Sequence, residues 1–276
     1  MSILEILKAV FFGIVEGVTE WLPVSSTGHL ILLDEFIQLN ESAEFKSMFD
    51  VVIQLGAIMA VVVLYWKQIF PFSFKTKPVI KKDIFTLWFK ILTACIPAAV
   101  VGLLFDEVFE KYFYNPVSVS IALIVIGIAF IILESFNKGK KTRVNSLSEI
   151  TFKDALLIGV FQLLAAVFPG TSRSGSTIMG GLAIGVSRSV IAEFTFFLAI
   201  PVMFGASLLK LVKFGFHFTG EEAAILIIGM IVAFVVSMFV IKFLMGYIKK
   251  HNIIVFGWYR IVLGVVVLLC GVAGLL

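Results

Sequence analysis

A serine and a histidine with the spacing of a catalytic pair lie near the start of the chain. Ser26 and His29 are three residues apart, so they would share one face of a helix that begins near Ser25. A serine hydroxyl is a weak nucleophile at neutral pH, and histidine titrates in the range that lets it accept the hydroxyl proton or protonate a leaving oxygen. The pair therefore indicates a nucleophile with an acid–base partner; a surface histidine without chemistry is the alternative.

An arginine surrounded by hydroxyl side chains follows in the second half of the chain. Arg173 can hold two phosphoryl oxygens at once, and hydroxyl groups and free amides at helix N-termini add further donors. An arginine inside an apolar region is costly, so a purely structural role is the less favoured alternative. The expected ligand is an anion, for which phosphate is the best match. Its expected donors are Ser25, Thr27, Ser172, Ser174 and Thr177.

Two glutamates precede the serine and histidine pair. Glu16 and Glu20 are four residues apart on one helical face, where like charges repel, more strongly at low dielectric constant. A shared divalent cation, a raised pKa on one carboxyl group or a salt bridge to Arg173 would each relieve the repulsion. Oxygen ligands favour Mg²⁺ or Ca²⁺, so the expected cofactor is a divalent cation. Two glutamates at a hydrated helix end are the alternative.

The two polar clusters belong to a duplicated segment. The sequence GIVEGVTEWLPVSSTGH at 13–29 aligns at a constant offset with GVFQLLAAVFPGTSRSGS at 159–176. The alignment sets Ser26 on Ser172 and Thr27 on Arg173, and each copy is an apolar helix followed by a proline and a hydroxyl-rich turn. Inside a membrane such a turn must line a protein-walled cavity, because its backbone groups cannot face lipid.

Composition places the chain in the membrane. Hydrophobic residues make up 60% of it and charged residues 14%, which is more apolar than a soluble protein needs. Six apolar runs come close to the ~20 residues that cross a bilayer. They cover residues 48–66, 88–105, 117–135, 192–212, 222–245 and 254–275. The expected fold class is an all-α integral membrane protein with six transmembrane helices.

Four further apolar segments surround the polar turns. They pair as 3–22 with 25–39 and as 154–168 with 172–186. The second member of each pair is short, and a helix of about 15 residues covers only about 22 Å of the ~30 Å hydrocarbon core. We therefore expect two re-entrant helical hairpins whose tips stop inside the membrane.

The positive charges predict the orientation. Lysine and arginine concentrate in 67–90 and 136–153 and recur at Lys249 and Lys250, so these segments are expected to be cytoplasmic. Both termini then lie outside. The net charge of +4 reflects these loops, and nothing in their spacing suggests nucleic-acid binding.

This orientation predicts an inverted repeat within one membrane domain, residues 1–276. The first hairpin would enter from the outside and the second from the cytoplasm, which is the plan of many secondary transporters. Residues 1–135 form the first expected repeat and residues 154–276 the second. The two tips should meet near the middle of the membrane.

The motifs resemble those of the undecaprenyl-pyrophosphate phosphatase family, the bacterial bacitracin-resistance proteins. The family's ExxxE element corresponds to residues 16–20, and its PVSSTGH stretch is residues 23–29 without change. Its PGxSRSxxT element reads PGTSRSGST at 169–177. The similarity extends over the full chain, and the three elements in this order are far more specific than any one of them.

The resemblance implies hydrolysis of undecaprenyl pyrophosphate to undecaprenyl phosphate and inorganic phosphate, in the bacterial plasma membrane and at a site open to the outer side. It implies a role in recycling the lipid carrier for cell-wall polymers. Ser26 becomes the nucleophile with His29 as its partner, unless His29 itself attacks phosphorus. Arg173 becomes the clamp on the pyrophosphate, and Glu16 and Glu20 become the acidic pair that holds a metal or transfers protons.

Transport is the main alternative, because inverted repeats with broken helices also build carriers, here for a lipid phosphate or a small anion. The pair Ser26 and His29 argues against it, since a binding site needs no nucleophile. An anion channel is weaker still, because the paired glutamates would repel the anion unless a cation were bound. Gln54, with Asp50 nearby, is a further candidate substrate contact. The sequence leaves the oligomeric state open, and a homodimer is compatible with it.

Overall fold

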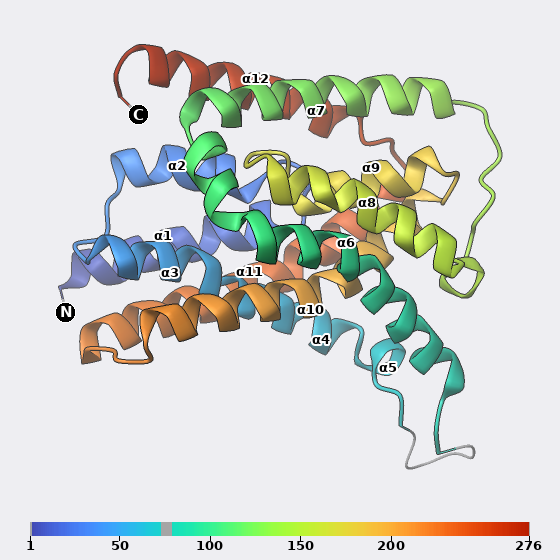
Figure 1. Ribbon diagram of the computed structural model, residues 1–276, viewed down its shortest axis with the longest axis horizontal. Helices are drawn as coiled ribbons and strands as arrows, with labels where there is room; N and C mark the ends of the chain where they lie inside the picture. Colours follow the sequence, from blue (N-terminus) through green and yellow to red (C-terminus); the bar gives the residue numbers. More distant parts are fainter. Residues whose placement is uncertain (1, 73–78, 276) are drawn as a thin grey trace.

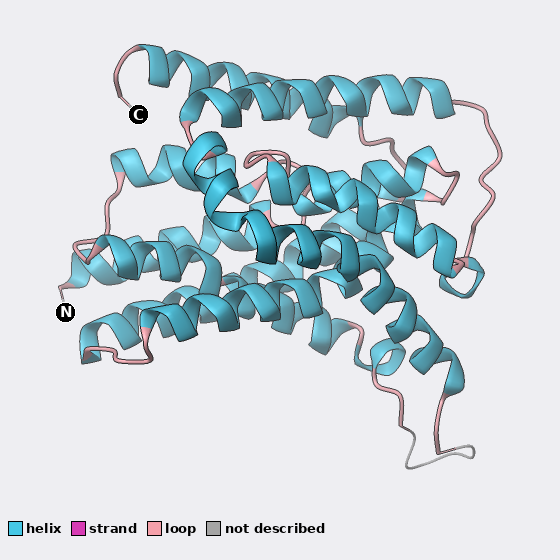
Figure 2. Cartoon of the chain, viewed as in Figure 1, coloured by secondary structure: helices cyan, strands magenta, loops and turns pink. Residues whose placement is uncertain are grey.

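The described fold is helical. The computed structural model describes residues 2–72 and 79–275, and most of its helices run along the long axis of the molecule (Figure 1). Within these residues there is no β-strand, and turns and loops connect the helices (Figure 2). Lys75 and Lys77 of the predicted loop 67–90 lie outside the described residues. The predicted all-α fold class is confirmed.

In the described parts of the chain, six helical segments are long and apolar enough to cross a membrane. They are Ala43–Leu64, formed by α3 (Ala43–Val52) and α4 (Gln54–Leu64), Lys82–Phe105 within α6 (Lys82–Phe113), α7 (Pro116–Asn137), α10 (Arg188–Phe214), α11 (Gly220–Ile248) and α12 (Ile254–Val272). These segments match the six predicted spans. The short helices α5 (Trp66–Ile69) and η1 (Leu147–Glu149) lie in connections.

The first span differs from its prediction of 48–66. It begins earlier, at Ala43, and it is interrupted at Ile53. There the backbone tightens, because the N–H of Gly56 donates to the carbonyl oxygen of Ile53, three residues back, at 3.0 Å. The hydropathy of the run gives no sign of this break, since the residues on both sides are apolar.

Two pairs of shorter helices hold the polar turns. α1 (Ile3–Thr19) and α2 (Ser26–Phe36) flank the first turn, and α8 (Phe152–Val167) and α9 (Arg173–Ala183) flank the second. In Figure 1 the first pair extends from the end that carries both termini, and the second pair extends from the opposite end. α2 and α9 each have 11 residues and so cover about 16 Å. Both are shorter than the apolar segments predicted there.

The two turns correspond in structure with a shift of one residue from the sequence alignment. Ser25 and Ser172 are the N-caps of α2 and α9, with φ of 75° and 71°. Their Oγ atoms accept from the N–H of Gly28 at 3.3 Å and of Gly175 at 3.2 Å. The cap hydrogen bond, and not the constant offset, fixes the correspondence. Ser26 is therefore the counterpart of Arg173, and the predicted match of Ser26 with Ser172 is wrong.

Glycine allows the first helix of each pair to touch a long helix closely. A Cβ atom at Gly13 would lie 2.6 Å from the carbonyl oxygen of Gly229 on α11. A Cβ atom at Gly159 would lie 2.3 Å from the carbonyl oxygen of Ala94 on α6. Small residues permit this backbone approach between membrane helices. The aligned glycines of the duplicated segment thus make equivalent contacts.

Helices α7 and α12 pack through a reciprocal glycine contact. A Cβ atom at Gly127 would lie 2.7 Å from the carbonyl oxygen of Gly257, and one at Gly257 would lie 2.8 Å from that of Gly127. The close packing holds α12 against the rest of the molecule, beside the polar turns that it contacts.

Candidate active site

The carboxylate of Glu20 joins the two polar turns. Its Oε1 accepts a hydrogen bond from Nη2 of Arg173 at 2.9 Å, and its Oε2 accepts one from Oγ of Ser26 at 3.0 Å. Glu20 is 7% exposed, so water screens the ion pair less than it would at the surface. Three of the residues that the sequence predicted for the site therefore lie together.

The local fold places these side chains at helix ends. Glu20 is the C-cap of α1, and Ser26 and Arg173 are the first residues of α2 and α9. The first amides of a helix have no partner within it, and the helix dipole adds partial positive charge there. Two helix N-termini and one guanidinium group therefore meet at the turns, an arrangement that suits an anion such as phosphate.

Hydroxyl groups brace the arginine. Ser174 donates through Oγ to the main-chain oxygen of Glu20 at 3.1 Å. Thr177 donates to the main-chain oxygen of Arg173 at 3.0 Å and hydrogen-bonds the hydroxyl of Thr195 at 2.9 Å. The main-chain oxygen of Thr195 in turn accepts from Nη1 of Arg173 at 3.0 Å. Ser174 and Thr177 thus fix the position of Arg173 in the free protein.

The side chains of the other residues that the sequence predicted as donors to the ligand do not hydrogen-bond to Arg173 in the described structure. Ser25 and Ser172 are the helix caps, and Oγ of Ser172 also lies 3.1 Å from Oγ of Ser174. Thr27 and Gln54 are partly buried, and within the described residues neither side chain hydrogen-bonds to the Glu20 cluster. Their contact with a substrate stays a prediction.

His29 is held away from the serine. Its Nδ1 lies 2.7 Å from the main-chain oxygen of Ser25, and its Nε2 lies 2.7 Å from the phenol oxygen of Tyr259. A carbonyl oxygen only accepts, so Nδ1 carries the proton; in the neutral ring, Nε2 then accepts from the phenol. The hydroxyl of Ser26 donates to Glu20 instead. The pairing of Ser26 with His29 predicted from their spacing is therefore not formed.

Helix α12 contributes two consecutive residues, Tyr259 and Arg260, that the sequence analysis missed. Tyr259 hydrogen-bonds His29, and the two rings are stacked with centroids 5.6 Å apart. Arg260 is fully buried. A charged residue within the apolar run 254–275 was a signal that could have found Arg260. No spacing or motif marks Tyr259.

The guanidinium group of Arg260 ties the two turns together through their backbones. It donates to the carbonyl oxygens of Pro23 at 3.3 Å, of Gly170 at 2.9 Å and of Thr171 at 2.7 Å. Within the described parts of the chain, no carboxylate forms an ion pair with it. Its charge therefore adds to that of Arg173 and makes the region between the turns more attractive to an anion.

Glu16 is a buried residue whose carboxylate lacks hydrogen-bond partners in the described part of the chain. It is fully buried, and neither carboxylate oxygen has a hydrogen-bond partner among the residues that the structure describes. Gln162, its counterpart in the duplicated segment, is also buried with both amide atoms unpaired. Buried polar groups without partners are rare and indicate a missing ligand, ion or water.

The side chains near the two turns fit a metal ion that substrate phosphate also binds. Within residues 2–72 and 79–275, no group of three or more His, Cys, Asp or Glu side chains could hold a metal ion. Both oxygens of Glu20 are taken by Arg173 and Ser26. Mg²⁺ is often held by one or two carboxylates together with substrate phosphates and water. Glu16 therefore fits a cation shared with a phosphate and does not fit one enclosed by protein alone.

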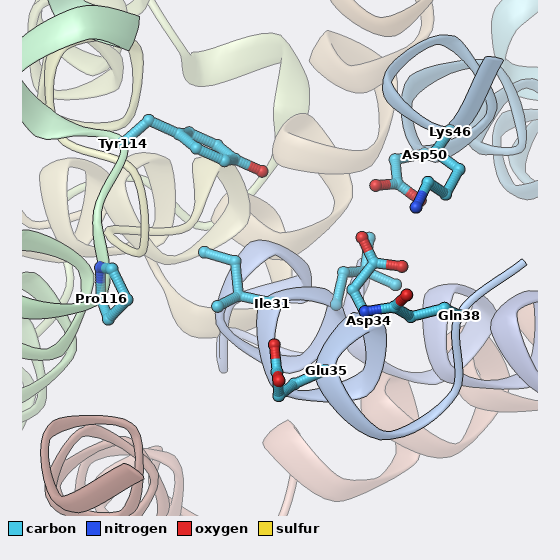
Figure 3. A pocket seen from close by; sticks show the side chains of 9 residues that line it. Ile31, Asp34, Glu35, Gln38, Lys46, Asp50, Tyr114 and Pro116 are labelled. Carbon is cyan, nitrogen blue, oxygen red and sulfur yellow. The ribbon is translucent and has the colours of Figure 1, made fainter. Parts of the chain in front are cut away.

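Asp50 lies in an acidic cavity beside the site. The cavity has a volume of about 300 Å³ and lies between α2, α3 and the start of α7 (Figure 3). Asp34 and Glu35 of α2 line it, as do Lys46 and Asp50 of α3. Leu30, which follows His29, also lines it, so the cavity reaches along α2 toward the turn.

Comparison with known proteins shows the family of the chain. The family model described as "Bacitracin resistance protein BacA" matches residues 9–266. The chain belongs to the BacA family. With six apolar helices of spanning length, this member of the BacA family is a multi-pass membrane protein.

Relatives of this BacA-family chain cover nearly its whole length. The undecaprenyl-diphosphatase of Desulfitobacterium hafniense is 65% identical over 98% of this chain and 97% of the relative. The undecaprenyl-diphosphatase 1 of Clostridium acetobutylicum is 62% identical over 97% and 98%. The undecaprenyl-diphosphatase of Enterococcus faecalis is 60% identical over 98% of each chain. The family predicted from the motifs is thereby confirmed.

The contact between Tyr259 and His29 can be tested without any assay of activity. In the BacA-family protein, Tyr259→Phe should move the ¹⁵N resonance of His29 Nε2, because the hydrogen bond to this nitrogen is lost. NMR of ¹⁵N-histidine-labelled protein in detergent measures the shift. Tyr247→Phe is the control, since Tyr247 stacks on His251 with centroids 4.6 Å apart. A His29 resonance that moves equally in both variants would contradict the contact.

Proposed function

We propose that this chain hydrolyses undecaprenyl diphosphate to undecaprenyl phosphate and inorganic phosphate. The observation that carries the proposal is the hydrogen bond from Ser26 to a carboxylate whose other oxygen is bound by Arg173. The set supplies a nucleophile, a proton acceptor and a cation for phosphoryl oxygens. The names of relatives 54–65% identical support the same substrate. The reaction recycles the lipid carrier for cell-wall polymers and fits the bacitracin resistance in the family's description.

Glu20 is placed to take the proton of Ser26. The Ser26 oxygen attacks the terminal phosphorus, the bond from this phosphorus to the bridging oxygen breaks, and its electron pair leaves with undecaprenyl phosphate. Water then attacks the phosphoserine, the bond from phosphorus to the Ser26 oxygen breaks, and Glu20 returns its proton to that oxygen, while the hydrogens of the water leave with inorganic phosphate. Arg173 and the first amides of α2 and α9 stabilise the charge that spreads over the phosphoryl oxygens.

Substrate must compete with Glu20 for Arg173. In the free protein the guanidinium group is occupied by the carboxylate. A phosphate can offer two oxygens to the guanidinium group, whereas Glu20 binds it through Oε1, and a phosphate carries more negative charge, so it can draw the guanidinium away. Glu20 then loses its cationic partner and becomes a better acceptor for the proton of Ser26. Binding of the substrate thereby activates the nucleophile.

His29 has a separate part in this proposal. Its Nε2 contacts Tyr259, which is 48% exposed, so the imidazole is directed toward α12 and away from Ser26. There it can hydrogen-bond an oxygen of the substrate once the phenol turns away. For His29 itself to attack phosphorus, Nε2 would likewise have to leave Tyr259, because Nδ1 is bound to Ser25. Ser26 needs no such rearrangement.

The alanine substitution of Ser26 tests the reaction. Ser26→Ala should lower kcat for phosphate release from undecaprenyl diphosphate by about 100-fold or more, because the nucleophile is lost. Ser135→Ala is the matched control, since the Ser135 hydroxyl donates to the carbonyl oxygen of Ile131 in its own helix. The rates are measured with purified protein in detergent.

Equal turnover by Ser26→Ala and Ser135→Ala would overturn the assignment of the nucleophile. If the wild-type protein released no phosphate but moved the lipid across vesicle membranes, the transport alternative would replace hydrolysis.

A divalent cation is part of the proposal. Glu16 would hold Mg²⁺ or Ca²⁺ together with substrate phosphate oxygens, and the cation would neutralise the charge of the diphosphate when bound. The unpaired, buried carboxylate supports this role.

Chelation tests the role of the metal. EDTA should reduce phosphate release at least ~10-fold, and excess Mg²⁺ or Ca²⁺ should restore it, because a bound cation stabilises the charge of the reacting phosphates. Glu16→Gln should weaken the response of the remaining activity to added cation. Turnover that is unaffected by EDTA would leave Glu16 without a metal and return it to a role in proton transfer.

The proposal places the site between two inverted repeats, residues 1–135 and 154–276. The packing of α1 on α11 corresponds to the packing of α8 on α6, and α7 and α12 pack reciprocally on each other. The two short helix pairs extend inward from opposite ends of the molecule (Figure 1). These features support two re-entrant hairpins. The lysine- and arginine-rich segments 67–90 and 136–153 support an orientation with both termini outside.

The orientation can be tested by labelling. The cysteine of Lys140→Cys should resist an impermeant thiol reagent in intact cells, because the segment 136–153 would be cytoplasmic; labelling there would reverse the orientation.

A further inference from the structure

A second cavity lies at the end of the molecule opposite the termini. It has a volume of about 540 Å³ and lies between the segment after α7, the α9–α10 turn and the end of α11. Four cationic side chains line it, and they come from three separate parts of the chain: Lys140, Lys141, Arg188 and Lys249. The proposed hydrolysis assigns no part to any of them.

The cavity has excess positive charge. Among the described residues that line it, Glu134 is the only acidic one, and it is 3% exposed. Arg188 neutralises that carboxylate through two hydrogen bonds, from Nε at 2.7 Å and from Nη2 at 2.5 Å. Within the described residues, the three lysines form no ion pair with a carboxylate. Their charges are therefore available to a ligand.

The wall that carries Lys140 and Lys141 is anchored to the protein. The N–H groups of Arg143 and Val144 both donate to the carbonyl oxygen of Gly185, at 2.7 and 3.2 Å, and the N–H of Ser187 donates to the carbonyl oxygen of Val144 at 2.9 Å. Asn137, at the start of the segment, donates through Nδ2 to the carbonyl oxygen of Leu182 at 3.1 Å. Both ends of the lysine segment are thus fixed beside the cavity.

Neutral donors add to this charge. Ser187 and Ser189 line the cavity, and Ser187 is the N-cap residue of α10, but within the described residues its side chain makes no cap hydrogen bond. In α8 and α11, by contrast, the threonine before the helix accepts from its own first turn. The serine hydroxyls can therefore donate to a ligand held by the lysines.

The cavity at the other end has the opposite character. There Asp34, Glu35 and Asp50 outnumber Lys46 (Figure 3). An anion is therefore repelled at one end of the molecule and attracted at the other. Cytoplasmic lysines need only lie near the end of a membrane helix to set topology; Lys81 and Lys82 lie at the start of α6 and do not line this cavity. Topology alone does not account for four cations converging on one cavity.

We propose that this cavity binds a phosphate group, carried by the headgroup of an anionic lipid or by a free anion. Basic pockets between membrane helices are suited to lipid phosphates. The volume accommodates a glycerophosphate headgroup. Phe136 next to Asn137 is 67% exposed and Phe243 on α11 is 60% exposed, so apolar surface that suits acyl chains lies close by. The site is separate from Ser26 and goes beyond the proposed hydrolysis.

Binding to the full-length protein in detergent tests the proposal. The probes are dioctanoyl phosphatidylglycerol, dioctanoyl phosphatidylcholine and inorganic phosphate, measured by isothermal titration calorimetry. The variant Lys140→Ala/Lys141→Ala/Lys249→Ala should bind phosphatidylglycerol at least ~10-fold more weakly than the wild type, because three charge contacts are lost. The control Lys67→Ala/Lys81→Ala/Lys82→Ala removes the same charge from side chains outside the cavity and should bind as the wild type does.

The probes distinguish the two sources of the phosphate. If the lysine variant loses phosphatidylglycerol binding but not inorganic phosphate binding, the cavity is assigned to a lipid headgroup. If it loses both, the cavity is assigned to phosphate itself. The proposal would be overturned if the lysine variant bound phosphatidylglycerol and inorganic phosphate as well as the control variant does. It would also be overturned if the lysine variant lost phosphatidylcholine binding to the same extent as phosphatidylglycerol binding. The lysine variant should still release phosphate from undecaprenyl diphosphate, so failure here is separable from failure of the hydrolytic assignment.

Discussion

A guanidinium group inside an apolar helical protein needs an acceptor for its charge, and Arg173 finds it in Glu20, 153 residues earlier in the chain. An ion pair of this kind is costly to desolvate, so it persists only where geometry and further hydrogen bonds are good. Ser26, Ser174 and the carbonyl oxygen of Thr195 supply those hydrogen bonds. The pair fixes where the two polar turns meet, and with them the first amides of α2 and α9.

The turns themselves are under local strain that the surroundings hold in place. Ser25 and Ser172 have positive φ, which is unfavourable for residues other than glycine and recurs at functional sites. Their cap hydrogen bonds and the contacts of Arg260 with both turns maintain the conformation. The result is a preorganised group of donors, which is what phosphoryl transfer requires of a protein.

The sequence predicted the parts of this site that leave a local pattern. Apolar runs of spanning length, the proline followed by hydroxyls and the arginine in an apolar setting all indicated helices and an anion site before any contact was known. The partner of Ser26 could not be predicted, because the three-residue spacing to His29 is local, whereas the contact with Glu20 depends on how the chain turns between two helices. The one-residue shift between the two copies of the duplicated segment arises from a cap hydrogen bond, which a sequence alignment does not represent. Tyr259 depends on the packing of α12, which no motif encodes.

A double-mutant cycle measures how strongly Glu20 and Arg173 depend on each other. Thermal unfolding of Glu20→Gln, Arg173→Gln and the double variant is compared with the wild type in detergent. Each single substitution leaves a buried charge or donor without its partner, whereas the double variant removes both charges. We expect the double variant to be about as stable as the less destabilised single variant, or more stable. If the two single losses of stability instead add up in the double variant, Glu20 and Arg173 do not depend on each other, and the ion pair does not hold the two turns together.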